Sequence, residues 1–135
     1  MTHSFVWPVR VYWEDTDAGG VVYYANYLKF MERARTEWLR SLGVEQGPLK
    51  DQHALMFVIL DTEAHYKLPA KYGDLLQVTC VLQEHTRTSI TFGQNIYRTT
   101  LDGELLVQGK SRAACVDAAT FKPQRIPAML LKEFA

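Results

Sequence analysis

The sequence lacks a long uncharged run and an excess of charge of either sign. The longest segment without Asp, Glu, Lys or Arg is Ala18–Leu28, which has 11 residues, whereas a membrane-spanning helix needs about 20 apolar residues. Lysine and arginine total 15, and aspartate and glutamate also total 15, so the formal net charge is zero. This balance argues against a general nucleic-acid-binding protein. We therefore expect no transmembrane segment and no nucleic-acid partner.

Cysteine is scarce and histidine is scattered. Cys80 and Cys115 both lie in apolar segments, which favours buried thiols. No cysteine or histidine pair has metal-ligand spacing, so no metal site is expected; the histidines are His3, His53, His65 and His85. The residues before Phe5 contain no basic segment followed by an apolar one, as a signal peptide would. Together these features predict a cytoplasmic location.

The composition is that of one folded domain. The chain has 135 residues, of which 47% are hydrophobic and 22% are charged. This length and this apolar fraction argue against disorder and suit a single hydrophobic core. We expect one domain over residues 1–135.

One long amphipathic helix is the clearest predicted element. Its apolar residues recur at steps of three and four, the period of a helical face; they are Tyr27, Phe30, Met31, Ala34, Trp38 and Leu42. Asn26 is the expected N-cap, and Gly43 fits the left-handed position after the helix. Val44 and Leu39 are then expected to make the contact of a Schellman motif.

The remaining segments predict an antiparallel sheet. Expected strands are Phe5–Trp13, 54–67, Leu75–Glu84, Ser89–Leu101 and Glu104–Asp117, followed by a short helix at Ala128–Phe134. Pro8 suits an edge strand, and Asp102-Gly103 is typical of a type I′ hairpin turn. One sheet of five antiparallel strands curled around one long helix is an α+β fold. Apolar residues on its outer face, such as Leu75 and Val81, favour an oligomer.

The chemistry-bearing residues gather in one loop before the helix. Glu14, Asp15 and Asp17 precede Gly19-Gly20, and the apolar segment 21–24 leads into the helix. A helix N-terminus offers unpaired N–H groups and partial positive charge, which would stabilise the oxyanion of an acyl group under attack. A nearby carboxylate would supply the nucleophile or the base. Spacing alone also fits a solvated turn, in which the aspartates only bind backbone N–H groups.

A longer motif resolves that choice by resemblance. Residues 10–27, RVYWEDTDAGGVVYYANY, and 30–37, FMERARTE, resemble the signature of hotdog-fold acyl-CoA thioesterases of the 4-hydroxybenzoyl-CoA type. Within that family they are similar to the YbgC group, the bacterial thioesterases associated with the Tol–Pal cell-envelope system. The likeness extends to residues 66–70 and 115–117. It implies a five-stranded antiparallel sheet wrapped around a central helix, assembled into dimers and often into tetramers.

The resemblance also implies roles for individual residues. Asp17 is the expected catalytic carboxylate, Asp15 is structural, and the backbone N–H of Tyr24 polarises the carbonyl. Many YbgC-group members have histidine at the position of Tyr24, so a mechanism that needs an imidazole there is doubtful. The side chain of Tyr24 is then either a pocket-lining group or a packed aromatic. Val22 and Asn26 are expected to contact substrate.

The phosphates of coenzyme A require cations. Arg87 and Ser89, with Thr88, lie in a turn between two strands and are the first candidates for this contact; further cations are Lys67, Lys71 and Arg112. Glu32 and Glu37 are alternative catalytic carboxylates. Either one would instead pair with an arginine three residues later on the helix, Arg35 or Arg40.

The sequence therefore predicts an enzyme that hydrolyses acyl-CoA to a carboxylate and free CoA. Asp17 acts as nucleophile or as general base, and no metal or organic cofactor is expected. The first alternative is a module that binds an acyl group or acyl carrier protein with little turnover. The second is a hydratase or dehydratase, although the sequence has no histidine near Asp17. Acyl-chain preference and the choice between dimer and tetramer stay open.

Overall fold

The computed structural model describes residues 5–132. Expectations for His3 and for the end of the last helix at Phe134 lie outside this range. The elements in chain order are β1 (Phe5–Arg10), a 3₁₀ turn (Trp13–Asp15), α1 (Asn26–Ser41), α2 (Gln46–His53), β2 (Leu55–Tyr66), β3 (Leu75–His85), β4 (Ser89–Arg98), β5 (Leu105–Asp117) and α3 (Ala128–Leu131).

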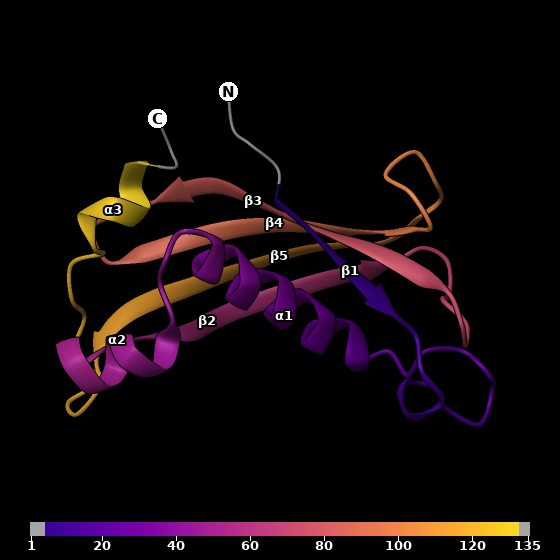
Figure 1. Cartoon of the computed structure of the whole chain (residues 1–135), viewed down its shortest axis with the longest axis horizontal. Helices are drawn as coiled ribbons and strands as arrows, with labels where there is room; N and C mark the ends of the chain where they lie inside the picture. Colours follow the sequence, from indigo (N-terminus) through magenta and orange to yellow (C-terminus); the bar gives the residue numbers. More distant parts are fainter. Residues whose placement is uncertain (1–4, 133–135) are drawn as a thin grey trace.

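Five strands form one antiparallel sheet in the order β1-β3-β4-β5-β2. Figure 1 shows the sheet curving around α1, which lies on its concave face. β1 is an edge strand, as the position of Pro8 predicted. The expected fold, a five-stranded antiparallel sheet wrapped around one long helix, is therefore confirmed.

The central helix has the expected length and end. α1 has 16 residues, and its buried residues lie on one face. Gly43 has φ of 82°, its N–H bonds to Arg40 O, and the N–H of Val44 bonds to Leu39 O at 3.0 Å, as in a Schellman motif. The N-cap prediction was wrong: Asn26 is the first helical residue, and its side-chain amide donates to Asp15 O at 2.9 Å. The amide faces the neighbouring loop and is not available as a cap acceptor.

Strand β2 carries a bulge and a free edge. Its pairing with β5 shifts register between Ile59 and Asp61, and a bulge of this kind exchanges the two faces of a strand. This explains why the sequence changes there from a continuous apolar run to alternation. β2 pairs only with β5, so one edge of a 12-residue strand has no neighbour in the described chain.

Three local expectations were wrong. The first strand ends at Arg10 because the N–H of Tyr12 bonds to Asp15 Oδ2 and the chain turns. Helix α2 was not predicted, since its sequence has Gly and Pro and buries no residue. The Asp102-Gly103 segment is not a two-residue type I′ turn, because Arg98 N–H bonds to Glu104 O and five residues, 99–103, lie between them. In that connection the positive φ belongs to Thr99.

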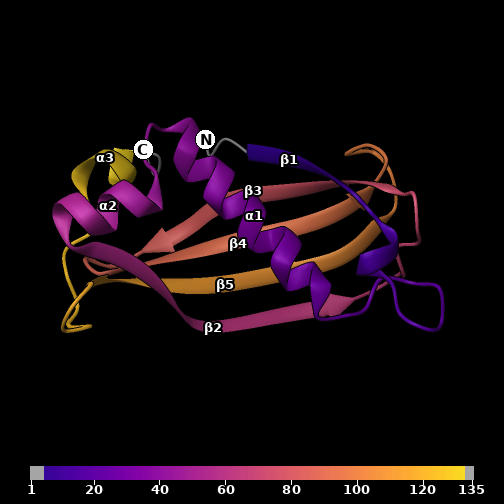
Figure 2. The same ribbon diagram turned by 60° about the horizontal axis from the view of Figure 1, so that its bottom comes forward.

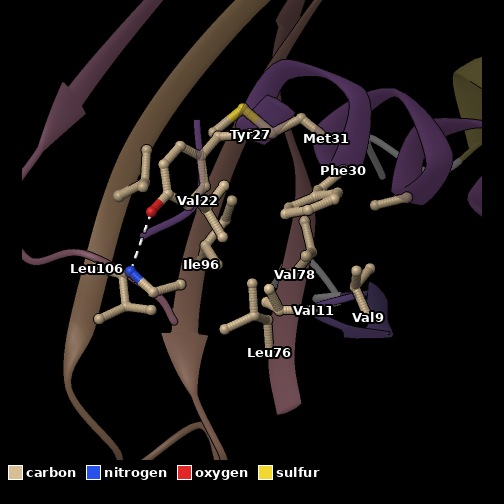
Figure 3. Close-up of a cluster of buried hydrophobic side chains, with 13 residues drawn as sticks. Val9, Val11, Val22, Tyr27, Phe30, Met31, Leu76, Val78, Ile96 and Leu106 are labelled. Atoms are coloured by element: carbon tan, nitrogen blue, oxygen red, sulfur yellow. Dashed lines mark hydrogen bonds between the residues drawn. The ribbon is translucent and has the colours of Figure 1, made fainter. Parts of the chain in front are cut away.

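The core fills the space between α1 and the sheet. Figure 3 shows Tyr27, Phe30 and Met31 of α1 facing valine, leucine and isoleucine side chains of the strands. Both cysteines are buried free thiols, as predicted. Burial raises the pKa of Cys80 to about 12, so this thiol stays protonated at neutral pH.

Gly109 of β5 leaves space for the end of the Met31 side chain of α1. A Cβ atom on Gly109 would lie 2.5 Å from Met31 Cε. Gly109→Val is therefore expected to lower the free energy of unfolding by about 1–3 kcal/mol, measured by urea denaturation. Equal stability of the Gly109→Val variant and the wild type would contradict this packing.

Helix α2 offers a glycine with open space around it. A Cβ atom on Gly47 would meet nothing within 4 Å, so Gly47→Ala is expected to raise the free energy of unfolding by up to about 1 kcal/mol.

Candidate active site

The loop between β1 and α1 is held together by Asp15. This residue is 8% exposed, and its Oδ2 accepts the Tyr12 N–H at 2.8 Å. Its backbone oxygen accepts two donors, the N–H of Tyr23 and the amide of Asn26, each at 2.9 Å. These contacts fasten the loop to the first turn of α1. Asp15 and Asn26 thus build the scaffold of the site.

Asp17 lies at the outer tip of the same loop and is exposed. Its N–H bonds to Val21 O at 2.9 Å, and its Oδ1 accepts the Gly19 N–H at 2.8 Å. Gly20 closes the turn with φ of 78°, a conformation that favours glycine. No ion pair within residues 5–132 involves Asp17. The carboxylate is thus held by one backbone bond and presented outward.

The start of α1 offers an unused hydrogen-bond donor. The N–H groups of Val22 and Tyr23 bond to Ala70 O and Asp15 O, whereas the N–H of Tyr24 has no acceptor among residues 5–132. It lies just before the helix, where the helix dipole adds positive potential. An oxygen that develops negative charge beside this N–H would be stabilised.

Tyr24 borders a hollow of about 240 Å³ at this end of the helix. The lining is mostly apolar and aromatic; it comprises Val22, Tyr24, Tyr27, Tyr66, Lys67, Leu68 and Pro69. Lys67 gives the hollow one cation. Asp17 is not part of the lining in a single chain. The structure therefore brings Val22, Tyr24 and Lys67 together and leaves the carboxylate outside the hollow.

Sequence reasoning missed Tyr66. Its hydroxyl donates to Tyr24 O at 3.3 Å, and its ring lies 6.0 Å from that of Tyr24 and 5.6 Å from that of Tyr27. Burial raises the pKa of Tyr66 and of Tyr27 above the usual tyrosine value, so both phenols are neutral at neutral pH. The alternation at the end of β2 was the signal that placed Tyr66 on the helix side of the sheet.

A second hollow, of about 110 Å³, lies farther along α1. Aromatic and aliphatic side chains dominate its lining, which comprises Glu32, Arg35, Thr36, Trp38, Leu39, Gln46, Phe57, Ile59, Ile90, Phe92 and Ala113. Glu32 bonds to Thr36 and not to Arg35 as expected. Arg35 donates to Gln94 at 2.9 Å, and burial lowers its pKa below the usual arginine value. Glu37 forms the expected pair with Arg40 at 2.6 Å.

The candidate residues for coenzyme A lie elsewhere. Arg87 is exposed in the turn between β3 and β4, and the Ser89 hydroxyl bonds to Thr86 within that turn at 2.7 Å. Figure 1 shows this turn beside α3, at the opposite end of the sheet from the loop that carries Asp17. Within one chain, Arg87 and Ser89 are therefore not brought to the carboxylate.

The described residues hold no group of three or more metal-ligating side chains. No histidine of residues 5–132 lines either hollow beside α1. None of the helices in this part of the chain has the length and apolarity to cross a membrane. The groups available for chemistry at the start of α1 are a carboxylate, a backbone N–H, phenols and one ammonium.

Comparison with known proteins shows the family and the fold. The thioesterase-like superfamily matches residues 11–134. The chain is 44% identical to the acyl-CoA thioesterase YbgC of Haemophilus influenzae, over 94% of this chain and 91% of that protein. It is 40% identical to the acyl-CoA thioester hydrolase YbgC of Escherichia coli, over 98% and 97% of the two chains. A crystal structure of a 1,4-dihydroxy-2-naphthoyl-CoA thioesterase from Synechocystis has the same fold, with a TM-score of 0.89, 21% identity and coverage of 97% and 95%.

Proposed function

The chain belongs to the thioesterase-like superfamily, and on that premise we propose that it hydrolyses acyl-CoA to a carboxylate and free CoA. The unpaired N–H of Tyr24 at the start of α1 is the observation that carries the proposal. The fold is the hotdog fold that the resemblance implied. No resident metal or organic cofactor takes part in the proposed reaction.

Asp17 supplies the attacking oxygen or activates it. As a general base, its carboxylate takes a proton from water while the water oxygen bonds to the carbonyl carbon. As a nucleophile, it forms a mixed anhydride that water then splits. In either route the C–S bond breaks, the thiolate of CoA leaves and takes up a proton, and the oxyanion is stabilised by the Tyr24 N–H.

A module that binds acyl groups without turnover is the weaker alternative. The relatives from Haemophilus influenzae and Escherichia coli are named as thioester-hydrolysing enzymes and match nearly the whole chain. A hydratase that pairs an acid with a histidine is also disfavoured, because no histidine of the described chain borders the hollow at Tyr24. Release of free thiol from acyl-CoA separates hydrolysis from both alternatives.

The site is completed by a second copy of the chain. The free edge of β2 is a template for another strand, and large apolar side chains beside it are exposed, among them Leu28 (39%), Ile59 (47%) and Leu60 (49%). A two-fold axis at this edge would pair the two β2 strands antiparallel. The opposite ends of the two sheets would then be neighbours. We propose this dimer as the functional unit, with a tetramer formed by pairing of dimers.

The same axis explains the position of the coenzyme A candidates. Antiparallel pairing brings the β3–β4 turn of one copy toward the Asp17 loop of the other. Arg87 would then contact a phosphate of CoA as a bidentate donor, with the Ser89 turn beside it. Val22 and Tyr24 would line the hollow for the thioester, while Asn26 holds the loop in place. Each site thus takes its carboxylate and its phosphate contacts from different copies.

The acyl chain has an apolar path along α1. Tyr24 and Glu32 are eight residues apart, which corresponds to about 12 Å of helix. The second hollow begins there and is lined mainly by apolar side chains. We propose that it accepts the far end of longer acyl groups. Burial of methylene groups there would contribute about 0.8 kcal/mol each to binding.

The cellular setting is proposed from the family. We place the enzyme in the cytoplasm, in the Tol–Pal-associated group, with acyl carrier protein as a further partner and residues 1–135 as a single domain. The likeness to YbgC proteins over nearly the whole chain supports the grouping. The two free thiols support a reducing compartment.

Asp17→Asn tests the catalytic carboxylate. The amide retains an oxygen that accepts the Gly19 N–H, so the fold and the melting temperature are expected to be unchanged. The kcat for acyl-CoA should fall at least about 100-fold, because neither base nor nucleophile remains. The matched control is Glu14→Gln, an exposed acid in the same loop, which should keep wild-type activity. Full activity of Asp17→Asn would remove this residue from the mechanism.

Leu60→Asp tests the dimer. Two aspartates close to the proposed axis would repel each other, so the mass measured by sedimentation is expected to fall to half that of the wild-type assembly or less. Hydrolysis should be lost in parallel, because the site needs both copies. Leu101→Asp, which alters an exposed leucine in the β4–β5 connection, is the control. A monomeric Leu60→Asp variant with full activity would refute the shared site.

Ala113→Leu tests the acyl path. This alanine is 3% exposed and lines the second hollow, so a larger side chain would fill the space. We expect kcat/KM for long-chain acyl-CoA to fall by about 10-fold or more, in line with the loss of two or more buried methylene contacts. Acetyl-CoA serves as the control, and its kcat/KM should not change. A uniform loss for all chain lengths would argue against this path.

A further inference from the structure

Arg98, at the end of β4, holds the loop that joins β2 to β3. Its Nη2 donates to Pro69 O at 3.0 Å, its Nη1 pairs with Asp74 Oδ2, and its Nε donates to Glu104 Oε1 at 2.9 Å. The Arg98 side chain is only 22% exposed. Asp74 Oδ2 also accepts the Lys71 N–H at 2.9 Å. One guanidinium thus fixes both ends of the turn from Pro69 to Asp74.

The turn from Pro69 to Asp74 holds the segment around Tyr24 through Ala70. The buried residue Ala70 accepts the Val22 N–H at 2.9 Å and donates its own N–H to the Tyr27 hydroxyl at 3.0 Å. Figure 3 marks the second bond with a dashed line. Val22 and Tyr27 stand on either side of Tyr24 in the sequence. The orientation of the Tyr24 peptide therefore depends on where Ala70 is held.

We propose that Arg98 is a positioning residue for thioester hydrolysis, which acts through residues 69–74 to keep the Tyr24 N–H aligned with the developing oxyanion. The inference rests on the proposed function of the chain. It assigns to Arg98 an effect on kcat that its place outside both hollows would not suggest.

The shape of the side chain explains why an arginine stands here. A planar guanidinium directs several N–H groups at fixed angles to acceptors on different segments, whereas a lysine ammonium acts as a point charge. Hydrogen bonds with Glu104 and Asp74 raise the pKa of Arg98 further, so the charge is permanent. A lysine at this position keeps the positive charge beside Asp74 and Glu104 and loses only the fork of N–H groups. Loss of the fork should thus affect alignment more than folding.

Arg98→Lys is the first test, with hydrolysis of acyl-CoA as the measurement. A shift of a catalytic group by about 1 Å costs up to about 100-fold in rate, so we expect kcat to fall about 10- to 100-fold with KM changed less than about twofold. Arg40→Lys is the matched control. Arg40 also contacts two carboxylates, those of Glu37 and Glu45, but at the far end of α1. Its kcat should equal that of the wild type.

Binding of two unreactive analogues separates positioning from general weakening. An acyl-CoA thioether resembles the ground state, and a trifluoromethyl ketone analogue of acyl-CoA, as its hydrate, resembles the tetrahedral intermediate. Arg98→Lys should bind the thioether as the wild type does and should bind the ketone more weakly, by the same factor as the loss in kcat. Equal weakening of both analogues, or unchanged kcat, would overturn the proposal.

Tyr27→Phe provides a second variant that acts at the same point. It keeps the ring and removes the acceptor of the Ala70 N–H. As for Arg98→Lys, kcat should therefore fall while KM changes little. Unchanged kcat in this variant would also count against the inference. Hydrolysis by the wild type is the reference throughout. A wild type without thioesterase activity would refute the proposed function, whereas an active wild type with an equally active Arg98→Lys variant would refute only the role of Arg98.

Discussion

The attachment of one loop to the start of the central helix is the constraint on which the rest depends. Asp15 receives three hydrogen bonds, one at its carboxylate and two at its backbone oxygen. These bonds replace water for a buried acid and fix the path of the chain on both sides of Asp17. The carboxylate of Asp17 and the N–H of Tyr24 therefore lie on one hydrogen-bonded loop. A charged group and a dipole placed in advance need no reorganisation during the reaction.

Because α1 crosses the sheet obliquely, the proposed site of thioester hydrolysis and the proposed hollow for the acyl chain lie at different points along the helix. Figure 2 shows the helix crossing the sheet diagonally, with its N-terminal end over β2 and its C-terminal end toward β1. The N–H of Tyr24, which has no acceptor among residues 5–132, lies at the N-terminal end, where the helix dipole acts. Apolar space remains where α1 leaves β2, between Phe57 and Trp38. In the proposed reaction a single helix would therefore serve both the reacting carbonyl and the hydrocarbon chain attached to it.

The same path of α1 leaves the β2 edge of the sheet uncovered. α1 lies closer to β3 and β1 than to β2, and the edge of β2 has no partner in the described chain. Exposed apolar side chains beside an open strand edge are a liability for a monomer. Asp17 is exposed and is not part of the lining of either hollow beside α1. In the proposed dimer a second copy would cover the edge of β2 and enclose the carboxylate of Asp17.

The sequence by itself determined the helix, the number of strands and the location of the acid loop. Apolar spacing at 3.6 and 2 residues is a local property, and Gly43 and Pro8 mark ends and edges through their own backbone restrictions. Only the tertiary structure decided that Asn26 binds the loop, that Tyr66 reaches Tyr24, and that the turn of Arg87 lies at the far end of the sheet. Such contacts join residues distant in sequence, and their geometry follows from strand register and the bulge in β2. A one-residue shift there exchanges the faces of the strand, which local periodicity does not specify.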